Sequence, residues 1–464
     1  MDKPLRHLFL LFAVLFVALI VQLTYVQVWA APGLKTHPAN TRAIAEEMKI
    51  ARGDIISADG VKLATSRQEG EYYVREYPQG DLVSPWLGYS SVRYGRAGVE
   101  RIYNQELSGQ VGLLGLRTYW DQLLERTHEG ADLKLTVDLG VQRAAAAALG
   151  ERKGAVVALD PRTGAILAMV SYPRFDPNQI EEEWGELNSN PDAPFLNRIA
   201  YGLYPPGSAF KTVVAAAALE QGIVTLQTQF EDTGSVKAGG FIVNNYGGQV
   251  YGKHDLVEAF AESINTTFAK IGVELGSETL AGYAQAFGFG KELPWRLGGA
   301  TSRFPSANDL DKAHLAQVSY GQGEVLATPL EMALVAAGIA NKGTIMKPYL
   351  VAQVLDPKGK LISQTEPSEW LTPILPSTAK VVTDLMVAVV ERGTGTRAAL
   401  PGVKIAGKTG TAEVAGASPH AWFIGFGPAE DPRVAVAVLV ENGGTGGSVA
   451  APIARKVMAA VLGR

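Results

Sequence analysis

The sequence contains no cysteine among its 464 residues. This absence excludes disulfide bonds, cysteine nucleophiles and metal sites built on thiolates. The net charge is only −4, so the composition gives no sign of nucleic-acid binding. The six histidines are scattered and no Gly-x-Ser-x-Gly pattern occurs, which argues against a Ser-His-Asp hydrolase. With 47% hydrophobic and 19% charged residues, the chain has the composition of a globular protein with a sizeable core.

Acidic and basic residues are also missing from Leu8 to Leu34. Within this run, Leu8 to Val28 would form a helix of ~31 Å at ~1.5 Å per residue, enough to cross a bilayer core. One alternative is a cleaved signal peptide with a small-residue site at Ala30, and another is a buried core helix. The run is longer than the ~7–15 residues of a signal h-region and has no polar face, which favours a retained anchor.

The flanking charges predict how this anchor is oriented. Lys3 and Arg6 precede the apolar run, and positive charge stays on the cytoplasmic side of a membrane. We therefore expect residues 1–7 to be a cytoplasmic tail and residues 8–28 to be a single-pass span of the plasma membrane. The rest of the chain would be extracytoplasmic.

Two regions follow the anchor. Residues 29–130 are richly charged with short apolar runs, which predicts a small β-rich domain. In it, "RGDIISADGVKLATS" predicts two strands joined by an Asp59-Gly60 turn.

Residues 131–464 alternate between helical and strand patterns. "DLKLTVDLGVQRAAAAALG" predicts a strand, then a helix capped by Asp138 and ended by Gly150. "GAVVALDPRTGAILAMVSYP" predicts two strands around the turn at 161–164. Strands joined by short turns, with helices between, predict an α+β fold with an antiparallel sheet flanked by helices.

The first segment with chemical potential is "YPPGSAFKTVVAAAALEQG", residues 204–222. Two prolines and a glycine precede good helix formers, so Ser208 is expected at a helix N-terminus. Lys211 lies three residues on, on the same face. The helix dipole would stabilise an alkoxide at Ser208, and burial would lower the pKa of Lys211 toward that of a general base. The alternative for an isolated Ser-x-x-Lys is a helix cap with a surface lysine.

The second segment is Ser263-Ile264-Asn265, with helix-forming runs on both sides. It can sit at a break between helices. There, the hydroxyl can relay a proton and the amide can both donate to and accept from a peptide. The alternative is a helix cap by Ser263 or Asn265.

The third segment, Lys408-Thr409-Gly410-Thr411, allows two interpretations. With Gly402 and Gly407 it matches a P-loop, which needs a strand before it and a helix starting at the lysine. The apolar, β-prone residues around it favour an edge strand instead, where the lysine and threonines would hold a carboxylate. Gly410 would let a substrate backbone approach closely.

The order of the three segments separates them from two further matches. Ser377-x-x-Lys380 and Ser306-x-Asn308 have the same patterns, but they occur in reverse order and without the Pro-Pro-Gly context. We interpret the 377 match as a solvated helix start. The ordered set is the signature of serine acyl transferases that bind penicillin.

On these residues the chain resembles the class B penicillin-binding proteins, the membrane-anchored peptidoglycan D,D-transpeptidases. The resemblance covers nearly the whole chain. It implies a small pedestal domain at 29–130 and a transpeptidase domain, similar to that of β-lactamases, at 131–464. Further segments that carry it are "RGDIISADGVKLA", "GVERIYNQELSG", "TVDLGVQ", "GAVVALDPRTGAILAMVSYPRFDPN", "GQGEVLATPLEMA" and "HAWFIGF".

The resemblance implies acyl transfer in two steps. Ser208 attacks the penultimate D-alanine carbonyl of a stem pentapeptide, with Lys211 as base. Ser263 passes the proton to the departing D-alanine. The backbone N–H groups of Ser208 and Thr411 form the oxyanion hole. An amine of a neighbouring stem peptide then attacks the acyl-enzyme, and β-lactams acylate the same serine.

The remaining site residues would bind substrate. The resemblance implies that Asn265 contacts the peptide amide and that Lys408, Thr409 and Thr411 hold the terminal carboxylate beside Gly410. It implies no cofactor and no metal. It also implies a glycan polymerase and other cell-wall machinery as partners, besides the lipid bilayer.

Three related activities remain as alternatives. A D,D-carboxypeptidase uses the same residues but transfers the acyl group to water. A β-lactam receptor would need a cytoplasmic output domain, and residues 1–7 are too few for one. A class A β-lactamase is disfavoured by the anchor and by the region before residue 130. That region is also too short for a glycosyltransferase domain and short for class B enzymes in general.

Overall fold

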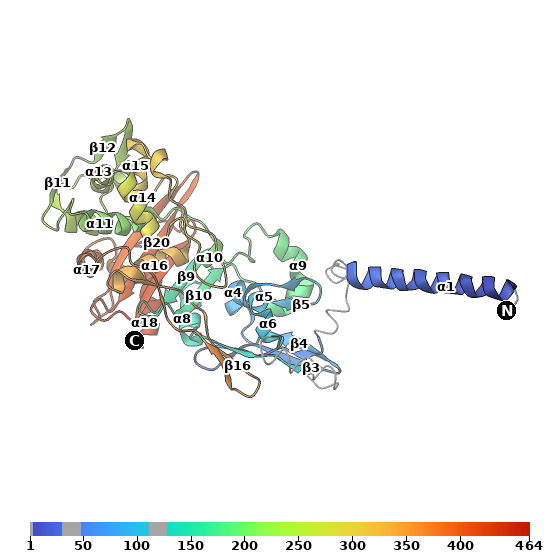
Figure 1. Cartoon of the computed structure of the whole chain (residues 1–464). Coiled ribbons are helices and arrows are strands. Elements are labelled where there is room, and N and C mark those ends of the chain that lie inside the picture. The colour runs from blue at the N-terminus through green and yellow to red at the C-terminus, as the bar shows by residue number, and fades with distance from the viewer. Residues whose placement is uncertain (1–2, 30–47, 111–127) are drawn as a thin grey trace.

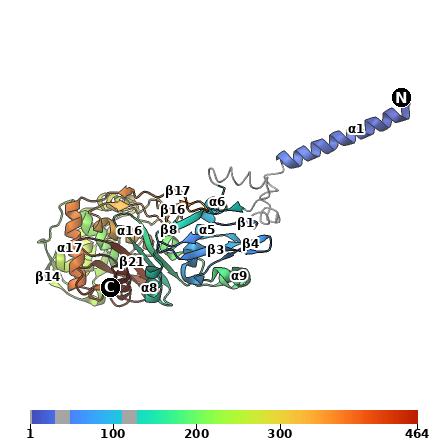
Figure 2. The ribbon, with the colours of Figure 1, turned by 90° about the horizontal axis from the view of Figure 1, so that it is seen from below.

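A computed structural model describes residues 3–29, 48–110 and 128–464. Parts of the predicted pedestal, and Ala30 at the alternative cleavage site, lie outside the described residues. Figure 1 shows the course of the chain, and Figure 2 shows strands β3 and β4 at one end of the folded body and helix α17 at the other.

The N-terminal apolar run forms helix α1 (Lys3–Thr24), continued by a π turn, η1 (Tyr25–Trp29). The segment from Pro4 to Trp29 has a mean hydropathy of 2.6, and it is long and apolar enough to cross a membrane. None of its most apolar stretch is buried against the rest of the described chain, and α1 stands apart in Figure 1. The alternative of a buried core helix is therefore wrong, whereas a signal sequence would pass the same test of length and composition.

A six-stranded sheet forms the pedestal, with strand order β17-β16-β8-β2-β3-β4. The Asp59-Gly60 turn joins β2 to β3 as an antiparallel pair, as predicted. Three of its strands follow residue 130 in the sequence, so the sheet contains residues from both sides of the predicted domain boundary. The boundary itself stays a prediction. The strands are β2 (Ile55–Ile56), β3 (Lys62–Glu69), β4 (Tyr72–Glu76), β8 (Asp132–Leu135), β16 (Val351–Leu355) and β17 (Leu361–Gln364).

Short elements complete the pedestal, and a buried ion cluster ties them to its sheet. Glu100 accepts hydrogen bonds from Arg52 Nη2 at 2.8 Å and Arg75 Nε at 2.6 Å. Burial by itself would raise the pKa of Glu100, but the charges of the two arginines outweigh burial and lower it. The short elements are β1 (Ile50–Ala51), η2 (Gly80–Val83), α4 (Ser84–Leu87), β5 (Ser90–Ser91), β6 (Gly95–Arg96), α5 (Gly98–Ile102), α6 (Asn104–Leu107) and β7 (His128–Glu129).

The C-terminal region is built on a five-stranded sheet of order β10-β9-β21-β20-β19. Every neighbouring pair is antiparallel, which confirms the predicted α+β fold. The predicted turn at 161–164 joins the first two strands, and β19 is an edge. The strands are β9 (Gly154–Leu159), β10 (Ile166–Tyr172), β19 (Ala406–Val414), β20 (Ala417–Gly427) and β21 (Val434–Val440).

Alternation along the strands feeds two separate cores. In β21, Ala435, Ala437 and Leu439 face one core while the four valines between and beside them face the other, because successive side chains point to opposite faces. Helices α8 (Leu139–Leu149) and α18 (Ala450–Val461) cover the valine face, and α16 (Pro329–Ala340) covers the other. Helix α8 is capped by Asp138 and ends at Gly150, as predicted.

A helical lobe packs beside the sheet at its β19 edge, together with α17 (Pro376–Glu391) (Figure 1). Its main helices are α11 (Lys211–Glu220), α12 (Leu256–Ala261), α13 (Asn265–Leu275), α14 (Ser277–Ala286) and α15 (Lys312–Val318). Two small antiparallel ribbons flank them, β11 (Gln229–Asp232) with β14 (Gly252–Asp255), and β12 (Ser235–Ala238) with β13 (Phe241–Asn244). The remaining elements are η3 (Pro177–Gln179), α9 (Ile180–Ser189), α10 (Arg198–Tyr201), η4 (Gly207–Phe210), η5 (Tyr246–Gly248), η6 (Ala307–Asp309), β15 (Ile345–Met346), β18 (Glu369–Leu371) and η7 (Thr396–Ala398).

Helix α16 buries one carboxyl group that has no hydrogen-bond partner in the described part of the chain. Glu331 is 1% exposed, and neither of its carboxyl oxygens has a hydrogen-bond partner in the described part of the chain. Burial raises its pKa to about 8. Between the unfolded value of 4.5 and about 8, the unfolded chain releases this proton while the folded chain keeps it. Rising pH therefore costs stability across this interval.

We expect Glu331→Gln to remove this cost. The stability of the variant relative to the unmodified protein should increase with pH between about 5 and 8, by at most ~1.4 kcal/mol per pH unit. Melting temperatures of both proteins at pH 5, 6, 7 and 8 measure the effect. Glu391→Gln, at the exposed end of α17, is the matched control. A difference in melting temperature that stays constant from pH 5 to 8 would contradict the prediction.

Candidate active site

Ser208 lies in the first turn of a helical segment, as predicted, although that turn is a 3₁₀ helix. The turn η4 (Gly207–Phe210) leads directly into α11, which begins at Lys211. Ser208 is partly exposed, whereas Lys211 is fully buried. The alternative of a cap with a surface lysine is therefore wrong.

Close backbone contacts hold the Ser208 turn in place. Trp422 Nε1 donates to the carbonyl of Pro205 at 2.9 Å, and the N–H of Gly207 donates to the carbonyl of Gly321 at 2.9 Å. Gly207 has φ +53°, and a Cβ on Gly321 would lie 1.9 Å from the Gly207 oxygen. These contacts fix the position of Ser208 relative to strand β20.

Ser263 occupies the break between α12 and α13, as predicted. Its φ is +60°, in the left-handed region that non-glycine residues seldom adopt. Ile264 takes the N-cap position of α13, without a side-chain cap, and Asn265 is its first residue. Neither Ser263 nor Asn265 caps the helix, so that alternative is wrong. Strain of this kind persists only where the surrounding structure imposes it.

Two buried lysines converge on Ser263. Lys408 Nζ donates to Ser263 Oγ at 2.8 Å, and Lys211 Nζ lies 3.3 Å from the same oxygen. Lys211 Nζ also donates to the Ser263 carbonyl at 2.6 Å and to Asn265 Oδ1 at 2.7 Å. The structure therefore brings all three predicted segments together.

Burial and proximity shift the pKa values of both lysines downward. The pKa of Lys211 is well below the usual lysine range because of burial and, in addition, the charge of Lys408. Burial lowers the pKa of Lys408 to about 7, against the opposing charge of Glu262. The lowered pKa of Lys211 favours its neutral amine, the form that a general base requires.

The third segment lies on strand β19, which confirms the edge-strand interpretation and makes the P-loop interpretation wrong. The strand runs through Lys408 without a helix starting there. Thr409 Oγ1 makes a 2.6 Å hydrogen bond with Thr394 Oγ1, and Thr411 Oγ1 accepts from the N–H of Gly446 at 3.4 Å.

The structure shows close packing within the protein at Gly410, and the predicted approach of a substrate backbone stays a prediction. A Cβ at this position would lie 2.7 Å from the Pro206 oxygen and 2.9 Å from Trp422 Cβ. Its backbone is covered by protein, so the absence of a side chain lets the Ser208 turn pack against β19.

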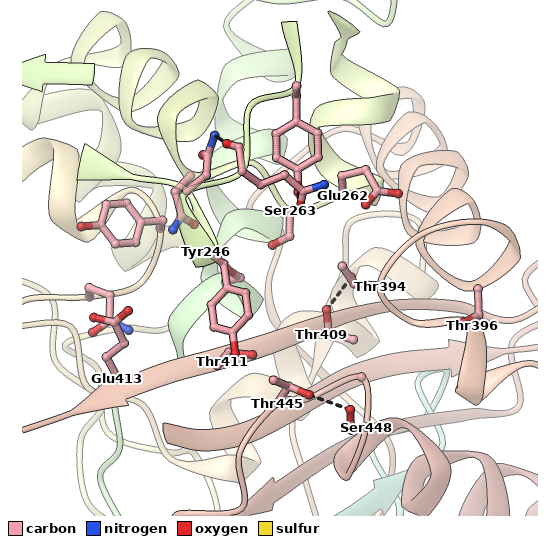
Figure 3. A pocket seen from close by; sticks show the side chains of 18 of the residues that line it. Tyr246, Glu262, Ser263, Thr394, Thr396, Thr409, Thr411, Glu413, Thr445 and Ser448 are labelled. Carbon is pink, nitrogen blue, oxygen red and sulfur yellow. Dashed lines mark hydrogen bonds between the residues drawn. The ribbon is translucent and has the colours of Figure 1, made fainter. Parts of the chain in front are cut away.

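A pocket of about 380 Å³ opens over these groups (Figure 3). Ser208, Ser263, Asn265, Thr409 and Thr411 all line it, whereas the two lysines are buried beneath. The other lining residues are Asn245, Tyr246, Gln249, Tyr251, Glu262, Tyr320, Gln322, Thr394, Thr396, Arg397, Glu413, Thr445, Gly447 and Ser448.

One buried network that supports the site was not predicted from the sequence. Asp232 accepts hydrogen bonds from Thr266 Oγ1 at 2.6 Å and Asn245 Nδ2 at 2.9 Å. Asn245 Oδ1 in turn accepts from the N–H of Thr266 at 3.1 Å. Burial would raise the pKa of Asp232, but the hydrogen bonds outweigh burial and lower it. The network fixes the start of α13, next to Asn265, and no motif marks it because its members come from separate elements.

The two further matches to the sequence patterns, Ser377-x-x-Lys380 and Ser306-x-Asn308, lie away from the pocket. They are called the decoy matches below. Ser377 and Lys380 are exposed at the start of α17, as predicted, and Lys380 pairs with Asp384. Ser306 donates to Asp309 in an exposed 3₁₀ turn. Neither decoy lines the pocket. In the described part of the chain, no group of three histidine or acidic side chains could hold a metal ion.

Two family models match the chain. The penicillin binding protein transpeptidase domain matches residues 154–459, and the penicillin binding protein A dimerisation domain matches residues 52–133.

Proteins that are similar to this chain over their whole length have names that agree with these family models. Peptidoglycan D,D-transpeptidase PbpA of Mycolicibacterium smegmatis is 40% identical, with 100% of this chain and 99% of that protein covered. Its counterpart in Mycobacterium tuberculosis is 38% identical over the same shares. The structure of the M. tuberculosis penicillin-binding protein A as a ceftriaxone acyl-enzyme complex is similar with a TM-score of 0.85 at 38% identity. That match covers 90% of this chain and 99% of the other.

Proposed function

The chain belongs to the family of penicillin-binding protein transpeptidases, and from this premise we infer how its residues carry out the reaction. It is a serine-type peptidoglycan D,D-transpeptidase that β-lactams acylate. We propose that the acyl-enzyme forms on Ser208. The observation that supports this most directly is the meeting of Lys211 and Lys408 at Ser263, beneath the pocket that Ser208 lines.

The hydrogen bonds of Lys211 fit a base. A neutral amine has two N–H donors and one lone pair. The carbonyl of Ser263 and the amide oxygen of Asn265 take both donors. The lone pair is left for a hydroxyl proton. Catalytic hydrogen bonds often tighten only with bound substrate, so Lys211 would accept the Ser208 proton in the substrate complex.

In the first step, Ser208 Oγ forms an ester bond with the carbonyl carbon of the penultimate D-alanine, and the peptide bond to the terminal D-alanine breaks. The proton removed from Ser208 goes to Lys211 and then, through Ser263, to the departing amine. Lys408 donates to Ser263 Oγ and so orients this hydroxyl for the transfer. The backbone N–H groups of Ser208 and Thr411 would stabilise the oxyanion, an effect worth about 10²–10³ in rate per donor.

In the second step, the amine of a neighbouring stem peptide attacks the ester carbonyl. A new peptide bond forms, the ester bond breaks, and Ser208 regains a proton. Before the first step, while the terminal D-alanine is still attached, the terminal carboxylate of the donor would contact Thr409 and Thr411, which line the pocket. Lys408, which is fully buried, would act on it from beneath through its charge.

The remaining parts of the proposal concern placement and partners. The apolar helix supports a single-pass anchor at residues 8–28, with residues 1–7 cytoplasmic and the pedestal and transpeptidase regions outside. A transpeptidase needs glycan strands, so we propose a membrane glycan polymerase as partner.

Product analysis tests transfer to an amine against transfer to water. The full chain in detergent, with its polymerase partner, is incubated with a pentapeptide donor and an amine acceptor, and the products are identified by mass spectrometry. We expect cross-linked dimer together with free D-alanine. Free D-alanine with tetrapeptide and no dimer would assign the protein as a D,D-carboxypeptidase instead.

A further inference from the structure

The charged residues of the pocket are separated along β19. Three charged side chains line the pocket, namely Glu262, Arg397 and Glu413. Arg397 belongs to the turn that carries Thr396, on the side of Thr409, because Thr394 bonds to Thr409. Glu413 lies beyond Thr411 in the opposite direction, as Figure 3 shows. Glu262 lies on the side of Thr394 and Thr396, so that end of the pocket carries charges of both signs, whereas Glu413 is the charged lining residue at the other end (Figure 3).

The strand geometry aims Glu413 into the pocket. Residues 409, 411 and 413 alternate with buried residues, so their side chains share one face. The pairing with β20 shifts between Ala412 and Val414, where Glu413 faces two residues of β20, Ser418 and Pro419, so the extra residue belongs to β20 and the alternation along β19 is kept.

Glu413 has no cationic partner of its own. In residues 48–110 and 128–464 it makes no ion pair, and its side chain is exposed. The charge of Glu413 acts on Tyr320, whose pKa is raised to about 12 by burial and, in addition, by this charge. Tyr320 carries no positive charge, so the carboxylate is left available to a cation that enters the pocket.

The substrate supplies such a cation. Donor and acceptor are copies of the same stem peptide, so every donor carries an amine as well as its D-alanyl-D-alanine end. If the donor binds extended along the β19 edge, its terminal carboxylate lies toward Thr409 and the reacting carbonyl lies at Ser208 beside Thr411. The residues before the reacting carbonyl then run toward Glu413, which is two strand residues, ~6.6 Å, beyond Thr411.

We propose that Glu413 determines donor specificity by binding the ammonium group of the donor's amine-bearing side chain. This inference rests on the proposed function and deepens it. An amine that is already acylated, as in a stem peptide that has served as acceptor, carries no charge for Glu413. The enzyme would therefore prefer donors that are not yet cross-linked.

Two matched β-lactams test this inference on the full chain in detergent. One penicillin has an acyl side chain that ends in a primary amine, and the other is its N-acetylated twin. The second-order rate of Ser208 acylation is measured for each. We expect the amine form to react roughly two- to fivefold faster, the range of a solvent-exposed ion pair, with the ratio shrinking as salt is added.

Variants assign the preference to one residue. Glu413→Gln should bring the ratio to one, Glu413→Lys should invert it, and Glu391→Gln, an exposed carboxylate away from the pocket, should keep it. An unchanged ratio in Glu413→Gln would overturn the inference. So would an equal loss of rate with both penicillins, which would indicate a structural role. A Glu413→Gln variant with a defect confined to cross-linking would also overturn the inference, because Glu413 would then bind the acceptor and not the donor.

The acylation rates of the unmodified protein distinguish a failure of this inference from a failure of the proposed function. If neither penicillin acylates Ser208, the proposed nucleophile is wrong. If both acylate Ser208 at equal rates, the nucleophile stands and only the role of Glu413 falls.

Discussion

Replacing Ser208 with alanine is expected to abolish labelling by a fluorescent penicillin. The variant lacks the only oxygen that we propose can form the ester, while Lys211, Ser263 and Lys408 remain in place. Loss of the serine nucleophile costs about 10⁶ in rate in another serine enzyme, which is beyond the range of a labelling assay. The side chain is small and partly exposed, so the fold should survive.

The decoy in α17 provides a matched control. Ser377→Ala removes an exposed hydroxyl from the same Ser-x-x-Lys pattern and should label like the unmodified protein. Melting temperatures of both variants establish that each is folded, and mass spectrometry of a tryptic digest locates the penicilloyl group. Full labelling of Ser208→Ala would move the nucleophile to another residue.

Replacing Lys211 with methionine should lower the acylation rate by about 10²–10⁴, the usual contribution of a general base. Methionine fills similar space in the buried site without an amine, so loss of the base is the main change. Two acceptors, the Ser263 carbonyl and Asn265 Oδ1, lose their donor, and a moderate loss of stability is expected as well. Lys380→Met, at an exposed lysine, is the control and should leave the rate unchanged.

The pH profile distinguishes a base from a structural residue. Only neutral Lys211 can accept a proton, and its pKa is lowered by burial and by Lys408, so the acylation rate should rise with pH well below the usual lysine range. Lys408 must stay protonated to attract the carboxylate, and its pKa is about 7, so the rate should fall as pH rises beyond that value. The pair titrates jointly, which gives a bell-shaped profile.

The rising limb should disappear in Lys211→Met, because no base remains to be deprotonated. Rates from pH 5 to 9, measured with a penicillin whose side chain does not titrate, test this. A variant that keeps the rising limb at reduced amplitude would show that another group is the base.

The fold could be predicted where the signal is local. The Asp59-Gly60 turn, the cap at Asp138, the stop at Gly150 and the apolar strands follow from residues that are neighbours in sequence. The pedestal sheet could not be predicted in this way. It recruits β8 and β16 from far along the chain, and a strand pattern does not specify which distant strand it pairs with.

The site shows the same division. Segment order and composition were enough to select Ser208 over Ser377 and Ser263 over Ser306. They could not show that Pro206 and Trp422 pack against Gly410, because these neighbours are distant in sequence.

The chemistry of this protein could be predicted from its residues, since side-chain identity specifies which groups are nucleophiles, amines and acceptors. Which of those groups act together depends on the folded chain. It buried two lysines around one serine and lowered their pKa values, and it left a single carboxylate unpaired at the far end of the pocket. Burial and charge proximity depend on contacts between distant segments, and no local pattern of residues encodes them.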